Sequence, residues 1–133
     1  MINVVFFKKS SEILGFEVKG HAFYADSGSD IVCAAVSALA LTCVGGIKDV
    51  LKLKHTCTIK GNGYVYIMLD NSLEKESIEK ANILFSTIEE GLKSISTNYP
   101  KNVLLSESEV WYYDIYESTT FRSQKGNGKY KKR

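Results

Sequence analysis

The sequence is poor in the residues that build disulfide frameworks and metal sites. It contains three cysteines and two histidines among 133 residues. The cysteines, Cys33, Cys43 and Cys57, are odd in number and widely spaced, which fits neither a set of paired disulfides nor a zinc ligand pattern. We therefore expect free thiols in a reducing compartment, with no cofactor and no metal. The chemical question is which thiol is reactive.

Long uncharged runs and a targeting segment are also lacking. The longest apolar run, Ile31 to Ile47, is interrupted by polar residues and a Gly45-Gly46 pair, and it is shorter than the roughly 20 residues of a membrane-spanning helix. The first residues, Met1 to Phe7, have no leading positive charge and no small-residue cleavage site, unlike a signal peptide. The sequence therefore predicts a cytoplasmic protein without membrane contact.

Charge is distributed unevenly along the chain. Residues 1–110 hold thirteen Asp or Glu against eleven Lys, whereas residues 111–133 hold six Lys or Arg against two Asp or Glu. The first segment is long enough to bury a hydrophobic core. We predict one domain over residues 1–110 and an extension over residues 111–133, first aromatic and then basic, whose end is predicted to be disordered.

Periodicity predicts the fold class of the first segment. Strands have a two-residue apolar period and amphipathic helices a three- and four-residue one. The predicted order is strand, strand, helix, strand, strand, helix, strand (ββαββαβ). This order indicates an α+β fold with two layers, a mostly antiparallel sheet packed with two helices. The strands are expected at residues 2–7, 13–19, 54–60, 64–69 and 103–110, and the helices from 31 to 52 or 54 and from 74 to 97.

Three local features of the sequence lead to further predictions about burial and helix geometry. Leu14, Phe16 and Val18 alternate with polar or small residues, so they are predicted to share the buried face of their strand. The first four turns of the first helix are apolar almost all round, which predicts burial on several sides. The Gly45-Gly46 pair leaves three explanations open: a kink, a close helix contact or a dimer seam.

One stretch, Gly20 to Ser37, combines a histidine and a cysteine in a way that suggests catalysis. His21 follows a predicted strand, and Cys33 lies in the first turn of a predicted helix that Ser29 or Asp30 can cap. Unpaired amides and the helix dipole at that position stabilise a thiolate. A histidine brought alongside can accept the thiol proton and later donate it to a leaving group.

The sequence also contains candidate donors to the oxyanion that acyl transfer forms, although the cysteine and the histidine each have a simpler structural explanation. The amides around Cys33, or those of Gly28 and Ser29, can hold an oxyanion. However, a lone cysteine in an apolar helix is more often a small buried hydrophobe, and a lone histidine after a strand is more often a surface residue. The Asp30 carboxylate, one turn from the sulfur, also makes a thiolate more costly.

Ser37 and the other thiols have less specific signals. Ser37 lies four residues after Cys33 and shares its helix face, where it can bond the thiolate, the histidine, or a carbonyl one turn back. Cys43 is predicted to lie in the core. His55 and Cys57 share a strand face, but a metal site there lacks further ligands.

The Gly20 to Ser37 stretch is similar to the signature of the ribosomal-processing cysteine protease family. The matching parts are Gly20-His21-Ala22, a loop containing Gly28, and Asp30 to Ser37, in the same order and spacing. The resemblance extends over roughly residues 1–110 in length and element order. The aromatic and basic segment from about Trp111 to Arg133 has no recognised counterpart in the family.

The resemblance implies a cytosolic bacterial cysteine endopeptidase. Such an enzyme removes an N-terminal extension from a large-subunit ribosomal protein, cutting after an aromatic pair, and forms a homodimer. The family's catalytic residues match His21 and Cys33, and its supporting motif positions match Gly20, Asp30 and Ser37. The loop between the catalytic residues, which contains Gly28, is implied to move on substrate binding.

The alternative from the sequence is a non-catalytic ribosome- or RNA-associated module. Six basic residues lie among glycines and aromatics in residues 111–133, and such segments bind RNA by neutralising phosphates. A solvated tail explains the same composition.

Overall fold

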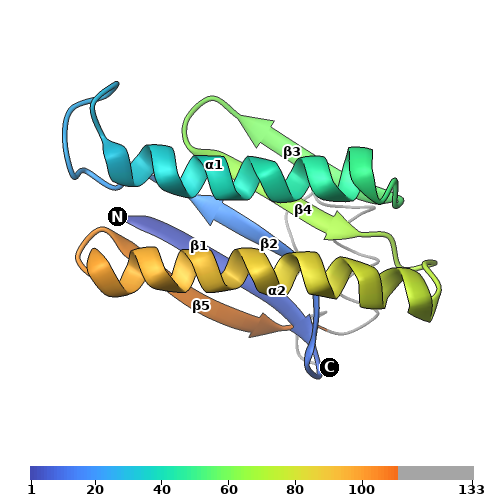
Figure 1. Ribbon diagram of the computed structural model, residues 1–133. Helices are drawn as coiled ribbons and strands as arrows, with labels where there is room; N and C mark the ends of the chain where they lie inside the picture. Colours follow the sequence, from blue (N-terminus) through green and yellow to red (C-terminus); the bar gives the residue numbers. More distant parts are fainter. Residues whose placement is uncertain (111–133) are drawn as a thin grey trace, which may run out of the picture.

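The computed structural model describes residues 1–110 as a two-layer α+β fold (Figure 1). The predicted order of strands and helices is confirmed, with one short π-helical segment, η1, added after the first helix. The elements are β1 (Ile2–Lys9), β2 (Glu12–Lys19), α1 (Ile31–Gly45), η1 (Gly46–Val50), β3 (His55–Lys60), β4 (Tyr64–Leu69), α2 (Lys75–Asn98) and β5 (Val103–Glu109). The predicted extension over residues 111–133, with its RNA contact, lies outside the described residues.

The five strands form one mixed sheet in the order β3-β4-β2-β1-β5. Three neighbouring pairs are antiparallel, and only β1 and β5 run parallel, which confirms a mostly antiparallel sheet. Both helices lie on the same face of the sheet, α1 against β4 and α2 against β2 and β5 (Figure 1). The loop before α1, the β3–β4 turn and the α2–β5 turn gather at one end of the molecule.

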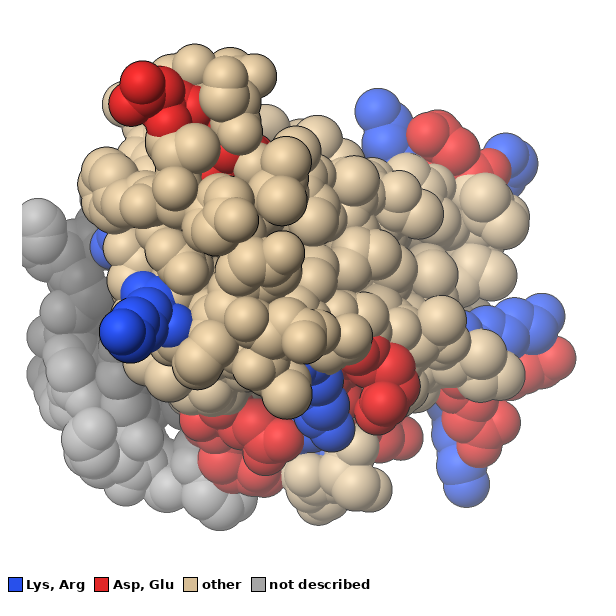
Figure 2. All heavy atoms as spheres, turned by 60° about the vertical axis from the view of Figure 1, so that its left-hand side comes forward, with Lys and Arg blue, Asp and Glu red and all other residues tan. Residues whose placement is uncertain are grey.

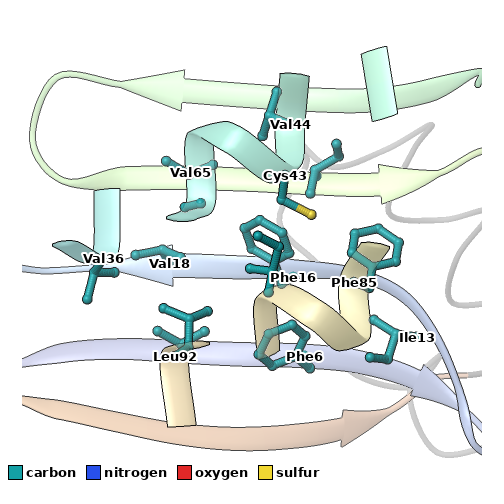
Figure 3. Packing of buried hydrophobic residues seen from close by; sticks show 14 of the residues in the cluster. Phe6, Ile13, Phe16, Val18, Val36, Cys43, Val44, Val65, Phe85 and Leu92 are labelled. Atoms are coloured by element: carbon teal, nitrogen blue, oxygen red, sulfur yellow. The ribbon is translucent and has the colours of Figure 1, made fainter. Parts of the chain in front are cut away.

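The main core fills the space between the sheet and the helices. Phe16 lies at its centre, with its ring 5.7 Å from that of Phe6 and 6.1 Å from that of Phe85. Figure 3 shows Cys43 of α1 beside these rings. Cys43 is fully buried, as predicted. The Phe16–Phe85 pair packs edge to face, an arrangement that stabilises a core beyond the area it buries.

Leu14 is not on the face predicted for it. The pairing of β1 with β2 shifts between Phe7 and Lys8, so a bulge interrupts the two-residue alternation at this point. Leu14 consequently packs with Tyr66 and Met68 in a second cluster, separate from the core that contains Phe16. The sequence pattern alone does not reveal the extra residue.

Helix α1 is buried on one side rather than several. Its buried residues include Val32, Val36 and Ala40, whereas Leu41 and other residues of the opposite face are exposed. The exposed face carries no charged side chain, because α1 contains none. Contrary to the expectation from sequence, the helical stretch Ile31–Val50 is long and apolar enough to cross a membrane by length and composition alone. Here one face of this stretch packs into the core of the domain.

The Gly45-Gly46 pair marks the end of α1 and a close helix contact. A Cβ atom at Gly46 would overlap a methyl group of Leu84 on α2, so glycine lets the two helices approach closely. The chain continues as the π-helical segment η1. It leaves helical geometry at Lys52, where φ is +54°, which ends the helix near its predicted boundary.

Candidate active site

His21 lies just beyond the end of β2, and the residues on either side of it in the chain, Gly20 and Ala22, fix its position. Gly20 has a φ of +106°, and a side chain there would meet the Met1 carbonyl, so this turn requires glycine. The Gly20 amide donates a hydrogen bond to the Gly63 carbonyl in the β3–β4 turn at 3.1 Å. The imidazole of His21 is exposed and therefore available to a bound molecule.

The Asp30 carboxylate caps α1 and also orders the preceding loop. One of its oxygens accepts from the amides of Val32 and Cys33, at 3.0 and 2.9 Å. The other accepts from the amides of Tyr24 and Ala25, at 2.9 and 3.3 Å. The predicted helix cap is thus confirmed at Asp30, and the same side chain ties the 22–29 loop to the helix that carries the cysteine.

These contacts make the stabilising effect of Asp30 depend on pH. The Cys33 amide, with those of Ala25 and Tyr24, lowers the pKa of Asp30 from its ordinary value of 3.8. A carboxylate with a lowered folded-state pKa stabilises the protein above the unfolded-state value, and this effect is lost as the pH falls through the folded-state pKa. Asp30→Ala is therefore expected to lower the urea midpoint of unfolding at neutral pH, with a smaller difference below pH 3.8.

Urea titrations of wild type and Asp30→Ala at about pH 7 and about pH 3 measure this difference. Asp26→Ala is the matched control, because Asp26 is an exposed carboxylate of the same loop whose side chain does not cap the helix. A midpoint difference for Asp30→Ala that stays the same at both pH values contradicts the assignment.

Cys33 lies in the first turn of α1 and is half-buried. The amide of Ala22 donates a hydrogen bond to its sulfur at 3.2 Å. Because Ala22 directly follows His21, the same bond brings the end of β2 against the start of α1. The sulfur is thus neither sealed in the core nor remote from the histidine.

Two cavities meet at this pair. The larger, of about 530 Å³, lies beneath the 22–29 loop, and the smaller, of about 270 Å³, lies between α1 and the β3–β4 turn. His21, Cys33 and Ser37 line both cavities. The two cavities therefore share the part of their walls that carries the histidine and the cysteine. Figure 2 turns this end of the molecule forward and shows a surface with few charged side chains.

The other predicted site residues have mixed outcomes. Gly28 lies in the exposed loop with a φ of +90° and lines the larger cavity. The Cys33 amide, one predicted oxyanion donor, is already bonded to Asp30, and the Ser29 amide is bonded to the Asp26 carbonyl at 2.9 Å. The neighbouring amides of Val32 and Ala34 are also bonded, to the Asp30 side chain and carbonyl. The Gly28 amide is the one predicted donor without a hydrogen bond inside residues 1–110.

The remaining thiols and the second histidine lie away from this pair. Burial raises the pKa of Cys43 to about 12 and also raises that of Cys57, so both stay protonated at neutral pH. His55 bonds the Leu53 carbonyl through Nδ1. Within the described part of the chain, no group of three or more His, Cys, Asp or Glu side chains is placed to hold a metal ion.

Some residues around the pair carried no sequence signal. Asn102, in the α2–β5 turn, donates to the Ala22 carbonyl at 2.9 Å. The ring of Tyr99 from the same turn packs edge-on against Tyr24 of the loop, with centroids 5.3 Å apart. These contacts join segments far apart in sequence, so no local motif contains them.

The sequence model that describes the cysteine protease Prp matches residues 1–104. The chain belongs to this family. It is 33% identical over 99 residues to the ribosomal processing cysteine protease Prp of Bacillus subtilis, an alignment that covers 74% of this chain and 88% of the relative. It is 30% identical over 91 residues to the Prp of Mycoplasma genitalium, covering 67% of this chain and 83% of the relative. The chain is therefore a cysteine protease, as the resemblance implies.

Solved structures show the same fold. A crystal structure from Streptococcus mutans has a TM-score of 0.70 at 28% identity, and covers 82% of this chain and 95% of its own. Staphylococcus aureus Prp in complex with a covalently linked product peptide has a TM-score of 0.71 at 24% identity, and covers 81% of this chain and 100% of its own. The Prp fold thus extends over most of the described residues.

Proposed function

We propose that this cysteine protease removes the N-terminal extension of a large-subunit ribosomal protein by cutting after an aromatic pair, with Cys33 as nucleophile and His21 as base and acid. The observation that carries the proposal is the meeting of two cavities at these two side chains. A protease needs room for a peptide on both sides of the scissile bond. Two cavities that share Cys33 and His21 as lining residues support such a role for this pair.

The proposed reaction uses only groups at this site. His21 takes the thiol proton, and the Cys33 sulfur attacks the scissile carbonyl carbon. The carbon–nitrogen bond then breaks, and His21 donates the proton to the departing amine, which leaves a thioester. Water attacks the thioester while His21 accepts its proton, and the acid is released as the thiol is restored. The Gly28 amide is the candidate donor to the oxyanion.

The smaller cavity suits an apolar part of the substrate. Its lining includes the apolar residues Val36, Leu41 and Ile59. The S. aureus relative has been solved with a substrate peptide, and the curated relatives are named as ribosomal processing proteases. A ribosomal-protein extension with an aromatic pair at the cut fits this lining.

The test is cleavage of two peptides that differ only at the proposed cut, one with adjacent phenylalanines and one with adjacent alanines. We expect the phenylalanine peptide to be cut after the pair, and the alanine peptide to have a kcat/KM lower by about tenfold or more. Mass spectrometry of the products locates the cut. Equal cleavage of both peptides, or cleavage elsewhere, would reject the proposed specificity.

We also propose a cytoplasmic homodimer. The uncharged exposed face of α1 (Figure 2) supports pairing with a second copy, because such faces are typical of interfaces. The three free cysteines support a reducing compartment. A solution mass twice the 14.8 kDa of one chain, and recovery in the cytoplasmic fraction, are the expected measurements. The mass of a monomer would reject the proposed homodimer, and recovery outside the cytoplasm would reject the proposed location.

A further inference from the structure

We propose that Asn102 is a positioning residue for the reacting pair. Its side-chain amide donates to the Ala22 carbonyl at 2.9 Å, and the Ala22 amide donates to the Cys33 sulfur at 3.2 Å. Asn102 would thereby hold an amide against the sulfur without touching the sulfur or the substrate. The inference rests on the proposed function, since it assigns Asn102 a role in the same reaction.

The backbone amide, the backbone carbonyl and the side chain of Ala22 are all fixed by their surroundings. Its methyl group is buried, with 1% of the residue exposed. Its amide and carbonyl belong to the two successive peptide units on either side of its α-carbon, and each makes one of the bonds described above. His21 therefore lies between this fixed residue and Gly20, which is itself bonded to Gly63. The position of the imidazole depends on both supports.

Asn102 is well placed to transmit this support because its own backbone is fixed. Its carbonyl accepts from the amide of Ile2, at the start of β1, at 2.8 Å. Its amide donates to the Tyr99 carbonyl, at the end of α2, at 2.9 Å. The side chain thus projects from a turn that is anchored to both layers of the domain.

Loss of the side-chain amide should loosen residue 22. The carbonyl would lose its donor, the α-carbon of residue 22 would be held less firmly, and the amide in the preceding peptide unit would move away from the sulfur. A displacement near 1 Å of a reacting group can reduce a rate by about a hundredfold, whereas one neutral hydrogen bond corresponds to about two- to tenfold. We expect kcat to fall about tenfold, with KM changed less than about twofold.

The chain supplies a matched control in Asn82. Asn82 lies on α2, and its side chain bonds both polar groups of Ile13, at 2.7 and 3.0 Å. It is half-buried like Asn102 and likewise joins segments far apart in sequence. Ile13 is remote from the two cavities, so Asn82→Ala should lower stability while leaving kcat unchanged.

The experiment compares wild type with Asn102→Ala, Asn102→Asp and Asn82→Ala, using the phenylalanine-pair peptide and amide hydrogen exchange. Asn102→Asp keeps the shape of the side chain but removes its donor at neutral pH. We expect both Asn102 variants to lose kcat about tenfold and the Ala22 amide to exchange at least about tenfold faster, with β4 amides unaffected. Asn82→Ala should show neither change.

Three results would overturn the inference: wild-type kcat in both Asn102 variants, unchanged exchange at Ala22, or an equal loss of kcat in Asn82→Ala. If Asn102→Ala does not fold, Asn102→Asp and the exchange measurement decide. Failure of the proposed function is distinguishable, because wild type would then not cut the peptide or Cys33→Ala would cut it equally well. In that case hydrogen exchange at Ala22 still tests the contact itself.

Discussion

Cys33→Ala is expected to abolish peptide cleavage. The sulfur forms the covalent bond to substrate in the proposed reaction, and alanine offers no nucleophile in its place. Removing the nucleophile of a protease typically lowers kcat by about four orders of magnitude or more. Fold and stability should change little, since Cys33 is half-buried and borders two cavities. Continuous assays of the phenylalanine-pair peptide, with urea unfolding of the same samples, measure both quantities.

Cys57→Ala is the matched control for this variant. Cys57 is also half-buried, but it lies on β3 opposite Ile67 and lines neither cavity. Its activity should match that of wild type. Alkylation with iodoacetamide at neutral pH should modify Cys33 first, because burial raises the pKa of Cys57 and Cys43 and the thiolate is the reactive form. Cleavage by Cys33→Ala at the wild-type rate would refute the nucleophile assignment.

His21→Ala is expected to lower kcat by about a thousandfold, because general acid–base catalysis by a positioned side chain contributes about 10²- to 10⁴-fold. KM should change little, since the cavity walls formed by α1 and the β3–β4 turn remain. The loss should be smaller than for Cys33→Ala, because the nucleophile and the bound peptide are retained. Initial rates over a range of peptide concentrations separate kcat from KM.

The only other histidine in the sequence provides the control. His55 begins β3 and pairs with Leu69, at the opposite end of that strand from the turn beside His21. His55→Ala removes a bond to the Leu53 carbonyl and should retain wild-type kcat. If His55→Ala and His21→Ala lose activity equally, the effect is one of folding and not of proton transfer, and the assignment of His21 fails.

Much of the fold could be predicted because its signals are local. The apolar alternation of β4 and the three- and four-residue spacing of α2 are set by side chains within one element, and both elements were predicted within about two residues of their bounds. The Leu14 bulge was missed because register depends on how β1 pairs with β2. The exposed face of α1 was not predicted, because the composition of a helix does not show how many of its sides other elements cover.

At the active site, too, local contacts could be predicted from the sequence and contacts between distant segments could not. Capping by Asp30 was predictable, since a helix cap involves residues two and three positions away. The occupation of the Cys33 amide by that same cap was not foreseen, although it removes one candidate oxyanion donor. Gly63 and Asn102 reach the site from the β3–β4 and α2–β5 turns, and nothing in their local sequence points to His21.

The sequence by itself determined the order of the elements, the helix start that carries Cys33, and the motif by which the family is recognised. These features depend on neighbours a few residues apart, where covalent geometry fixes which side chains can meet. Tertiary structure alone decided that Ala22 lies against the Cys33 sulfur, that Cys33 and His21 line the same two cavities, and that Asn102, eighty residues away, bonds Ala22. Such contacts arise only when the sheet and both helices pack together, because packing sets the distances between segments that the chain leaves free.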